Sequence, residues 1–339
     1  MSSRKLPFMP NKVVLYPKAC SRAFCHFFRK LSTGLGQGSH RILYLHRVGE
    51  AQSGFYPKGI ALEQLEELII ELRDLGFSFL SLTQALQQSR AGKKTGLSVS
   101  LTTDDGFSCN YNSLMPLLEK HRIPLTLFLI GKCVDNRALA WNHKLLLVRS
   151  HAAPEELESF VESIATEFAL PQAATAEARI FKVANSRKDE LADLLWERFC
   201  PISQAEYLRQ YQPFLSAEQL QELSREGVEI ALHSQTHADF SRLSFEEMQK
   251  EIRQNRLALN ELNLPVKPCF SLPYGRLCSA DKLAALCKTE KIELCLGTYY
   301  SLRDNRLGKL LWQRQPLELS PAALKLELWL RPWVRAFKR

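Results

Sequence analysis

The stretch LSVSLTTDDGF, residues 97–107, joins a strand pattern to two adjacent carboxylates. Apolar and polar residues alternate over Leu97–Thr102, which is typical of a β-strand. The strand then runs into Asp104, Asp105 and Gly106, and an Asp-Gly pair favours a turn. We therefore expect both acids at the point where a strand leaves the sheet.

Strands and helices alternate on both sides of this stretch. Short apolar runs predict further strands at residues 41–48, 125–130, 228–232, 269–272 and 292–297, and helical spacing predicts helices at 62–75, 113–121, 244–263 and 279–288. This alternation predicts a parallel α/β sheet or a (β/α) barrel. In such a barrel, the loops that follow the strands carry the chemistry.

Residues 136–212 interrupt the alternation. They are rich in Ala, Glu and Leu, have helical spacing and contain no strand pattern. We interpret them as a helical insertion, which could be a cap over the barrel mouth or a surface for a partner. The expected organisation is a basic extension at residues 1–39, a barrel at 40–320 that includes the insertion, and a basic amphipathic segment at 321–339.

The charge of the chain is concentrated at its two ends. The 339 residues include 45 basic and 36 acidic residues, which gives a formal charge of +9, yet residues 50–302 are net negative. The ends also contain aromatic side chains, among them Trp329 and Trp333. They could be terminal elements packed on the domain, or amphipathic segments at an anionic membrane surface. A nucleic-acid partner is disfavoured.

Cysteine usage and the first residues indicate a compartment. The nine cysteines form no CxxC pair, which disfavours a disulfide framework and favours a reducing environment. The N-terminal residues lack the apolar core of a secretory signal, and no apolar run reaches the length of a membrane span. We therefore expect a cytoplasmic protein, peripheral at the inner face of the membrane if its termini bind lipid.

A second polar motif, HSQTH at residues 233–237, follows the strand predicted at 228–232. In a helical turn, His233 and His237 would face the same side and could share a metal. Two imidazoles and one carboxylate form a typical catalytic zinc site, in which one position stays open for water. The other carboxylate of the Asp-Asp pair is then available as a general base. Pro273-Tyr274-Gly275 ends a third strand and offers a backbone N–H to an oxyanion.

Taken in order, four segments carry a resemblance to a known family: LYLHRVG at 43–49, LTTDDGF at 101–107, HSQTH at 233–237 and SLPYG at 271–275. The chain resembles the polysaccharide deacetylases, the NodB-homology domain of carbohydrate esterase family four, over about residues 40–135 and 212–318. The resemblance implies a distorted (β/α) barrel, usually of seven strands. It also implies removal of N- or O-acetyl groups from carbohydrates with a divalent metal, often zinc.

The resemblance assigns roles to individual residues. Asp104 matches the general base that acts on a metal-bound water, and Tyr274, after Pro273, matches the residue whose backbone amide completes the oxyanion hole. The residues that match the metal triad of the family are Asp105, His233 and His237. Pro273 and Arg314 are expected to bind substrate. Arg314 resembles an arginine found at that point in some relatives, but it could equally be a solvated surface residue.

Two departures from the family concern the partner of the base and the proton donor. Many members have an arginine beside the base at the position of Ser271, and many have a late histidine as general acid, but no histidine follows His237 here. The proton for the leaving amine could come from Asp104, from a metal-bound water or from His46, which could equally be structural. The remaining histidines, including His143, are expected to be surface or cap residues, and Trp141 is expected to pack.

The sequence thus predicts a metal-dependent hydrolase that removes an N-acetyl or other short acyl group from an amino-sugar glycan or a lipid-linked glycan intermediate. Zinc is the expected metal. One alternative is a deformylase of a lipid-linked amino sugar, and another is a carbohydrate-binding relative with impaired catalysis. Basic termini would attract a phosphorylated substrate or an anionic membrane.

Overall fold

The strand predicted over Leu97–Thr102 lies in the middle of a parallel sheet. The computed structural model describes residues 40–49, 59–93, 96–299, 310–331 and 334–335. Strand β3 (Ser98–Asp105) is buried along its whole length. It pairs in parallel with β1 (His40–Leu45) on one side and β4 (Leu125–Leu129) on the other. A strand buried on both faces in this way needs helices on the outside of the sheet.

The parallel strands form a nearly closed ring. The order is β8-β7-β6-β5-β4-β3-β1-β9, and the remaining strands are β5 (Glu229–Leu232), β6 (Val266–Ser271), β7 (Leu294–Gly297), β8 (Leu311–Gln313) and β9 (Gln315–Pro316). Strand β8 pairs with β7, and β9 pairs with β1. A single residue, Arg314, joins β8 to β9, so one chain segment bridges the two edges of the sheet. The predicted distorted (β/α) barrel is confirmed.

The number of strands differs from the predicted seven. The described residues form nine strands, because β8 and β9 are two pieces of one segment and because the two-residue strand β2 (Ser78–Phe79) adds to β3. Sequence periodicity predicted neither β2 nor the final segment. Both are too short to show an alternating pattern.

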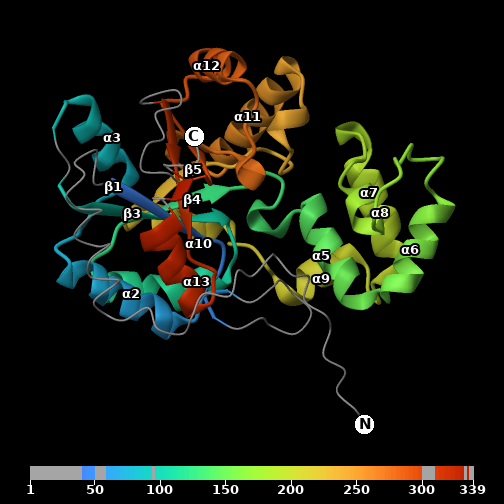
Figure 1. Cartoon of the computed structure of the whole chain (residues 1–339), viewed down its shortest axis with the longest axis horizontal. Helices are drawn as coiled ribbons and strands as arrows, with labels where there is room; N and C mark the ends of the chain where they lie inside the picture. The colour runs from blue at the N-terminus through green and yellow to red at the C-terminus, as the bar shows by residue number, and fades with distance from the viewer. Residues whose placement is uncertain (1–39, 50–58, 94–95, 300–309, 332–333, 336–339) are drawn as a thin grey trace, which may run out of the picture. The chain divides into compact units, whose positions relative to one another are not determined.

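Helices cover the outside of the ring (Figure 1). They are α2 (Leu62–Asp74), α3 (Leu82–Arg90), α4 (Met115–Lys120), α10 (Ala217–Arg225), α11 (Phe245–Asn260) and α12 (Ala280–Thr289). Capping boxes are formed by Ser216 with Gln219 and by Ser244 with Glu247. These boxes satisfy backbone N–H groups at the first turn and so fix where α10 and α11 begin.

Residues 136–212 are helical, as the sequence predicts. They form α5 (Trp141–His151), α6 (Pro154–Ser163), α7 (Ala176–Ile180), α8 (Lys188–Phe199) and α9 (Gln204–Tyr211), and no strand occurs between residues 136 and 212, all of which are described. Figure 1 shows these helices grouped together, in green to yellow. They bury a hydrophobic cluster of their own, which includes Leu145, Val161 and Leu191.

The C-terminal segment packs on the barrel. Helix α13 (Pro321–Lys325) continues into a turn over Leu326–Leu330, and Leu328 and Trp329 are buried in the same cluster as the barrel strands. Arg41 donates a hydrogen bond of 2.7 Å to the carbonyl of Leu328, and its guanidinium lies 4.6 Å from the Trp329 ring centroid. For these residues the structure supports the packed alternative. The basic extension at 1–39, Trp333 and residues 336–339 lie outside the described residues.

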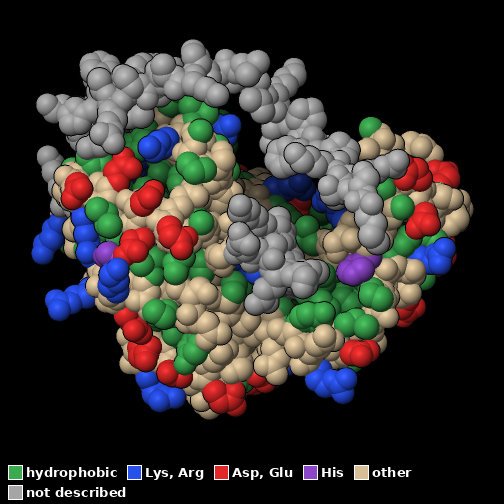
Figure 2. Space-filling model, turned by 90° about the horizontal axis from the view of Figure 1, so that it is seen from below, with side chains coloured by type: hydrophobic (Ala, Val, Ile, Leu, Met, Phe, Trp, Pro, Cys, Tyr) green, Lys and Arg blue, Asp and Glu red, His purple; other side chains and the backbone are tan. Residues whose placement is uncertain are grey.

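The described surface mixes charges of both signs. On the face shown in Figure 2, Lys and Arg side chains are interspersed with Asp and Glu side chains rather than gathered into one basic region. Among the described residues, no helix combines the length and the apolar character needed to cross a membrane.

Candidate active site

The polar residues singled out in the sequence meet at one edge of the barrel. Asp104 and Asp105 end β3, His233 follows β5, and Ser271 ends β6. Because all of these strands are parallel, their carboxyl ends face the same way. All four side chains are nearly inaccessible to solvent. The strand pattern therefore brings together residues more than 160 positions apart.

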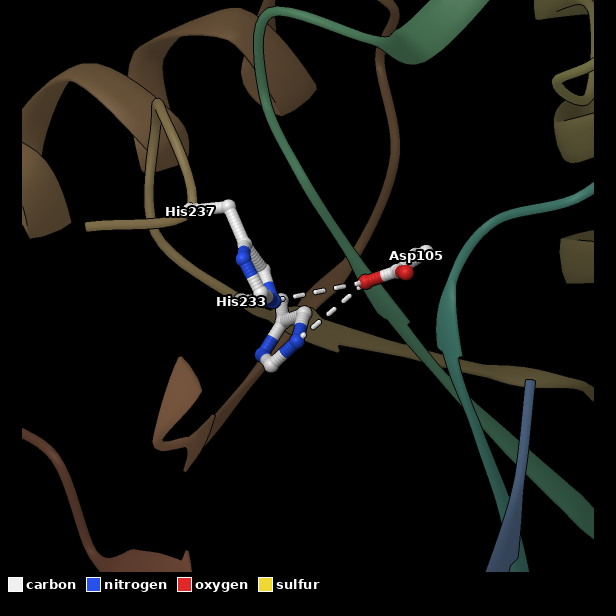
Figure 3. A group of neighbouring side chains, drawn as sticks. All are labelled: Asp105, His233 and His237. Atoms are coloured by element: carbon white, nitrogen blue, oxygen red, sulfur yellow. Dashed lines mark ion pairs between the residues drawn. The ribbon is translucent and has the colours of Figure 1, made fainter. Parts of the chain in front are cut away.

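Three side chains form a candidate metal centre (Figure 3). Each of Asp105, His233 and His237 offers a ligand atom, and these atoms all lie within 4.8 Å of one another. Oδ1 of Asp105 lies 3.4 Å from Nε2 of His233 and 3.7 Å from Nε2 of His237. Among the described residues, this buried Oδ1 has no hydrogen-bond partner. An orphaned carboxylate oxygen facing two imidazoles fits a divalent metal such as zinc.

The hydrogen bond of His233 and the burial of His237 suit ligation. The Nδ1 of His233 donates to the carbonyl of Ser271 at 2.8 Å, which leaves the lone pair on Nε2 for the site. Burial lowers the pKa of His237 well below its ordinary value, so this ring is neutral. A neutral imidazole is the form that binds a metal.

The loop that carries these histidines is not the helical turn that the spacing predicted. Ser234 and His237 have φ angles of 67° and 56°, and the segment between them is irregular. The two rings still converge, with centroids 5.0 Å apart. Non-glycine residues with positive φ are costly, and they concentrate at functional sites where neighbouring structure holds them in place.

Asp104 is held by an arginine from the opposite end of the chain. Nη1 and Nη2 of Arg314 lie 2.7 Å from Oδ1 and Oδ2 of Asp104, a bidentate pair. Ser271 Oγ accepts from Arg314 Nη2 at 2.6 Å and donates to Asp104 Oδ2 at 3.2 Å. Burial alone would raise the pKa of Asp104, but the Arg314 charge outweighs it and holds the pKa below its ordinary value. Asp104 is therefore ionised.

This pair changes the interpretation of two sequence positions. Arg314 was expected to bind substrate or to lie in solvent at the surface. It is instead fully buried against Asp104. It supplies the charge that many family members supply from the position of Ser271. The small Ser271 side chain leaves room for the guanidinium and bonds to it, so the departure at Ser271 and the presence of Arg314 explain one another.

His46 is paired with a carboxylate that the sequence analysis did not single out. Its Nδ1 lies 2.6 Å from Oε2 of Glu318, whose Oε1 accepts from the backbone N–H of His46 at 2.8 Å and of Arg47 at 2.7 Å. Burial would lower the pKa of His46, but the Glu318 charge and hydrogen bond raise it to about 10. The ring is therefore an imidazolium at neutral pH. Glu318 follows β9 and lies 272 residues from His46, so no local pattern could identify it.

The turn that follows β6, Pro273–Gly275, is strained and lies beside the histidines. Tyr274 has a φ of 59° within the turn Pro273–Gly275, and its ring meets the His237 ring edge-on at 4.6 Å between centroids. Gly275 has a φ of 62°, and a Cβ there would lie 1.9 Å from Thr298 Oγ1, so only glycine fits. Pro273 is buried within this turn.

His143 was expected to be a surface or cap residue, and the surface alternative was wrong. It does lie on α5 of the insertion, but it is fully buried and places Nε2 3.1 Å from Oδ2 of Asp105. Trp141, on the same helix, donates from Nε1 to the carbonyl of His237 at 3.3 Å. A lone histidine in a helical segment gave no spacing signal, and only packing of the insertion brings it to the site.

Comparisons with known proteins identify the family and similar folds. A sequence model of the family described as polysaccharide deacetylase matches residues 91–290. The curated Bacillus subtilis (strain 168) protein YxkH, which carries the name polysaccharide deacetylase, is 30% identical over 97 residues, or 28% of this chain and 33% of that protein. The match thus spans about a third of that relative.

Two solved structures share the fold. The Streptococcus pyogenes deacetylase PplD, solved in complex with acetate, is similar at a TM-score of 0.54 and 16% identity over 85% of this chain and 96% of that chain. IcaB from Ammonifex degensii is similar at a TM-score of 0.54 and 17% identity over 87% of this chain and 97% of that chain. At these identities the likeness concerns the fold alone.

Proposed function

The chain belongs to the polysaccharide deacetylase family, and we propose that it is a metal-dependent hydrolase acting on an acylated amino sugar. It would remove an N-acetyl or other short acyl group from a glycan or a lipid-linked glycan intermediate. The observation that carries this proposal is the buried cluster of Asp105, His233 and His237, whose ligand atoms lie within 4.8 Å of one another, beside an ionised Asp104.

Asp105 and the two histidines would hold the metal, for which zinc is the expected occupant. When bound, such an ion polarises an acyl carbonyl and makes water more acidic. Oδ1 of Asp105 faces Nε2 of both histidines, so one oxygen and two nitrogens point to the same place. Three protein ligands leave room for water and substrate, as is usual in catalytic sites.

Asp104 is the proposed general base. It lies next to the cluster, with Oδ2 3.8 Å from Nε2 of His233. Arg314 and Ser271 bond to its oxygens and fix its orientation. Asp104 would accept a proton from the attacking water while the water oxygen bonds to the acyl carbon. The Tyr274 N–H is proposed to stabilise the resulting oxyanion, since it follows Pro273 in the turn beside His237.

His46 is the proposed general acid. Breaking the C–N bond requires a proton on the leaving nitrogen, and His46 carries one at neutral pH because of Glu318. It follows β1, the strand that pairs with β3, and is partly accessible to solvent, with 27% of its side chain exposed. These observations support His46 over the two alternative proton sources. Arg314 also takes the place of the arginine that is missing at Ser271. Together, these observations weigh against the alternative of a carbohydrate-binding protein with impaired catalysis.

The free cysteines and the basic ends of the chain support a substrate that is attached to a lipid carrier. The seven described cysteines are free, which suits a reducing compartment such as the cytoplasm, where biosynthetic intermediates are found. The basic ends of the chain would attract a phosphorylated lipid carrier or an anionic membrane face. Leu328 and Trp329 are buried in the barrel, so any membrane contact is expected from other residues of the ends.

The test is mass spectrometry of N-acylated amino sugars on a polyprenyl phosphate carrier, before and after incubation with zinc-loaded protein. Loss of an acetyl mass supports the proposal, and loss of a formyl mass selects the deformylase alternative. Free amino-sugar oligosaccharides are incubated in parallel. Turnover of these alone would overturn the lipid-linked substrate, and carbohydrate binding without turnover of either substrate would overturn the enzymatic proposal.

A further inference from the structure

The helical insertion contacts the candidate active site at the ends of three strands, β3, β5 and β6. At the end of β3, His143 bonds to Asp105, and on the loop after β5, Trp141 bonds to the carbonyl of His237. On the loop after β6, Tyr274 packs against the hydrophobic cluster of the insertion. A cap that merely covered the barrel mouth would not need buried polar contacts to these residues, because each such contact must offset desolvation.

The His143 contact divides the two oxygens of Asp105. Oδ2 lies 3.1 Å from His143 Nε2, whereas Oδ1 faces His233 and His237. A carboxylate that ligates a metal only accepts hydrogen bonds, so His143 donates from Nε2 to Oδ2. The bond fixes the carboxylate rotation that presents Oδ1 to the two imidazoles.

Hydrogen bonds from two helices hold the loop that carries His233 and His237. Thr236, between the two histidines, donates from N at 2.8 Å and from Oγ1 at 2.7 Å to the carboxylate of Glu251 on α11. Lys188 on α8 of the insertion donates from Nζ to the same Oγ1 at 2.7 Å. Glu251 and Lys188 are both buried. The irregular loop is thus held between a barrel helix and an insertion helix.

We infer that the insertion is a structural part of the metal centre, with His143 as a positioning residue for Asp105 and Lys188 as a positioning residue for the loop of His233 and His237. The inference rests on the proposed metal site and deepens it. Outer contacts that orient metal ligands typically contribute about 10–100-fold to metal affinity. The insertion should therefore raise metal affinity without supplying a ligand.

The test is metal affinity, measured by competition with a chromophoric chelator, together with the visible absorption spectrum of the cobalt-substituted protein. His143→Phe removes the donor and keeps a ring between Phe107 and Phe214, whose centroids lie 5.3 Å from that of His143. We expect cobalt to bind about 10–100-fold more weakly, with a changed spectrum. His143→Gln, whose amide can donate from the place of Nε2, should restore most of the affinity.

Two further variants keep the test decisive. Lys188→Met should also weaken cobalt binding, and it probes the second contact if His143→Phe fails to fold. His151→Phe, on the exposed end of the same helix, should bind cobalt as the unmodified protein does. Unchanged affinity and spectrum in folded His143→Phe and Lys188→Met would overturn the inference. Failure of the unmodified protein to bind any divalent metal would instead overturn the proposed function.

Discussion

The barrel and the helical insertion both reach the candidate metal centre, but they contribute different parts of it. The barrel supplies the ligand atoms themselves, from the ends of β3 and β5. The insertion supplies bonds to the other atoms of the same groups, such as Oδ2 of Asp105 and the carbonyl of His237. The candidate ligands lie at or after the ends of barrel strands, whereas the insertion residues that contact them, His143 and Trp141, lie on helix α5.

The largest effect is expected from removing a barrel ligand. His233→Ala should abolish metal binding and reduce deacylation to background, because two ligands do not hold a catalytic metal and the carboxylate of Asp105 loses its neighbour at 3.4 Å. Metal content by mass spectrometry and turnover are measured on the same sample. If His233→Ala retained stoichiometric metal, the barrel would not be the source of the ligands.

The variant Asp104→Asn tests the role of the base independently of metal binding. We expect kcat/KM to fall about 10²–10⁴-fold, since the amide cannot take the proton, while metal content stays the same. The amide also retains an oxygen for Arg314. Activity close to that of the unmodified protein would show that Asp104 is not the base.

Arg314→Met breaks the buried pair at the point where the ring of strands closes. It leaves the Asp104 charge without its bidentate partner, so the free energy of unfolding should fall by about 3–5 kcal/mol. Without the cation, the pKa of Asp104 should rise, and the acidic limb of kcat/KM should move to higher pH. Urea denaturation and pH–rate profiles are the measurements. An unchanged acidic limb would contradict the assignment of Arg314 as partner of the base.

His46→Gln has a smaller expected effect, about 10²-fold in kcat/KM, because water can donate a proton less efficiently. The pKa of His46 is raised from 6.5 to about 10, so the imidazolium form persists through neutral pH. In the unmodified protein, kcat/KM should decline as pH rises through about 10. Loss of this alkaline limb in His46→Gln checks the role, and its persistence would exclude His46 as the acid.

The pair of His46 and Glu318 also makes the stability of the fold depend on pH. Because the folded pKa of His46 lies above its ordinary value of 6.5, its contribution to stability is fully present below pH 6.5. It is lost as pH rises through about 10. Thermal unfolding across this window should show a decline that Glu318→Gln removes.

Sequence patterns predicted the barrel side of the site well. Alternation over 97–102 predicts β3, and the polar motifs at the ends of β3 and β5 predict where the acids and histidines lie. These predictions succeed because a strand pattern is local and because parallel strands end at one edge. The conformation of the loop at 233–237 was not predictable in this way, since its positive φ angles are imposed by neighbouring contacts.

By itself, the sequence determined the alternation of strands and helices, the helical character of 136–212 and the identity of Asp104, Asp105, His233 and His237 as one set. Only the tertiary structure decided their partners: His143 for Asp105, 38 residues away, Arg314 for Asp104, 210 away, and Glu318 for His46, 272 away. Periodicity records which face of an element is buried. A hydrogen bond between two elements depends on how those elements pack against each other. Such packing produces no periodic pattern in the sequence, so the sequence does not predict the bond.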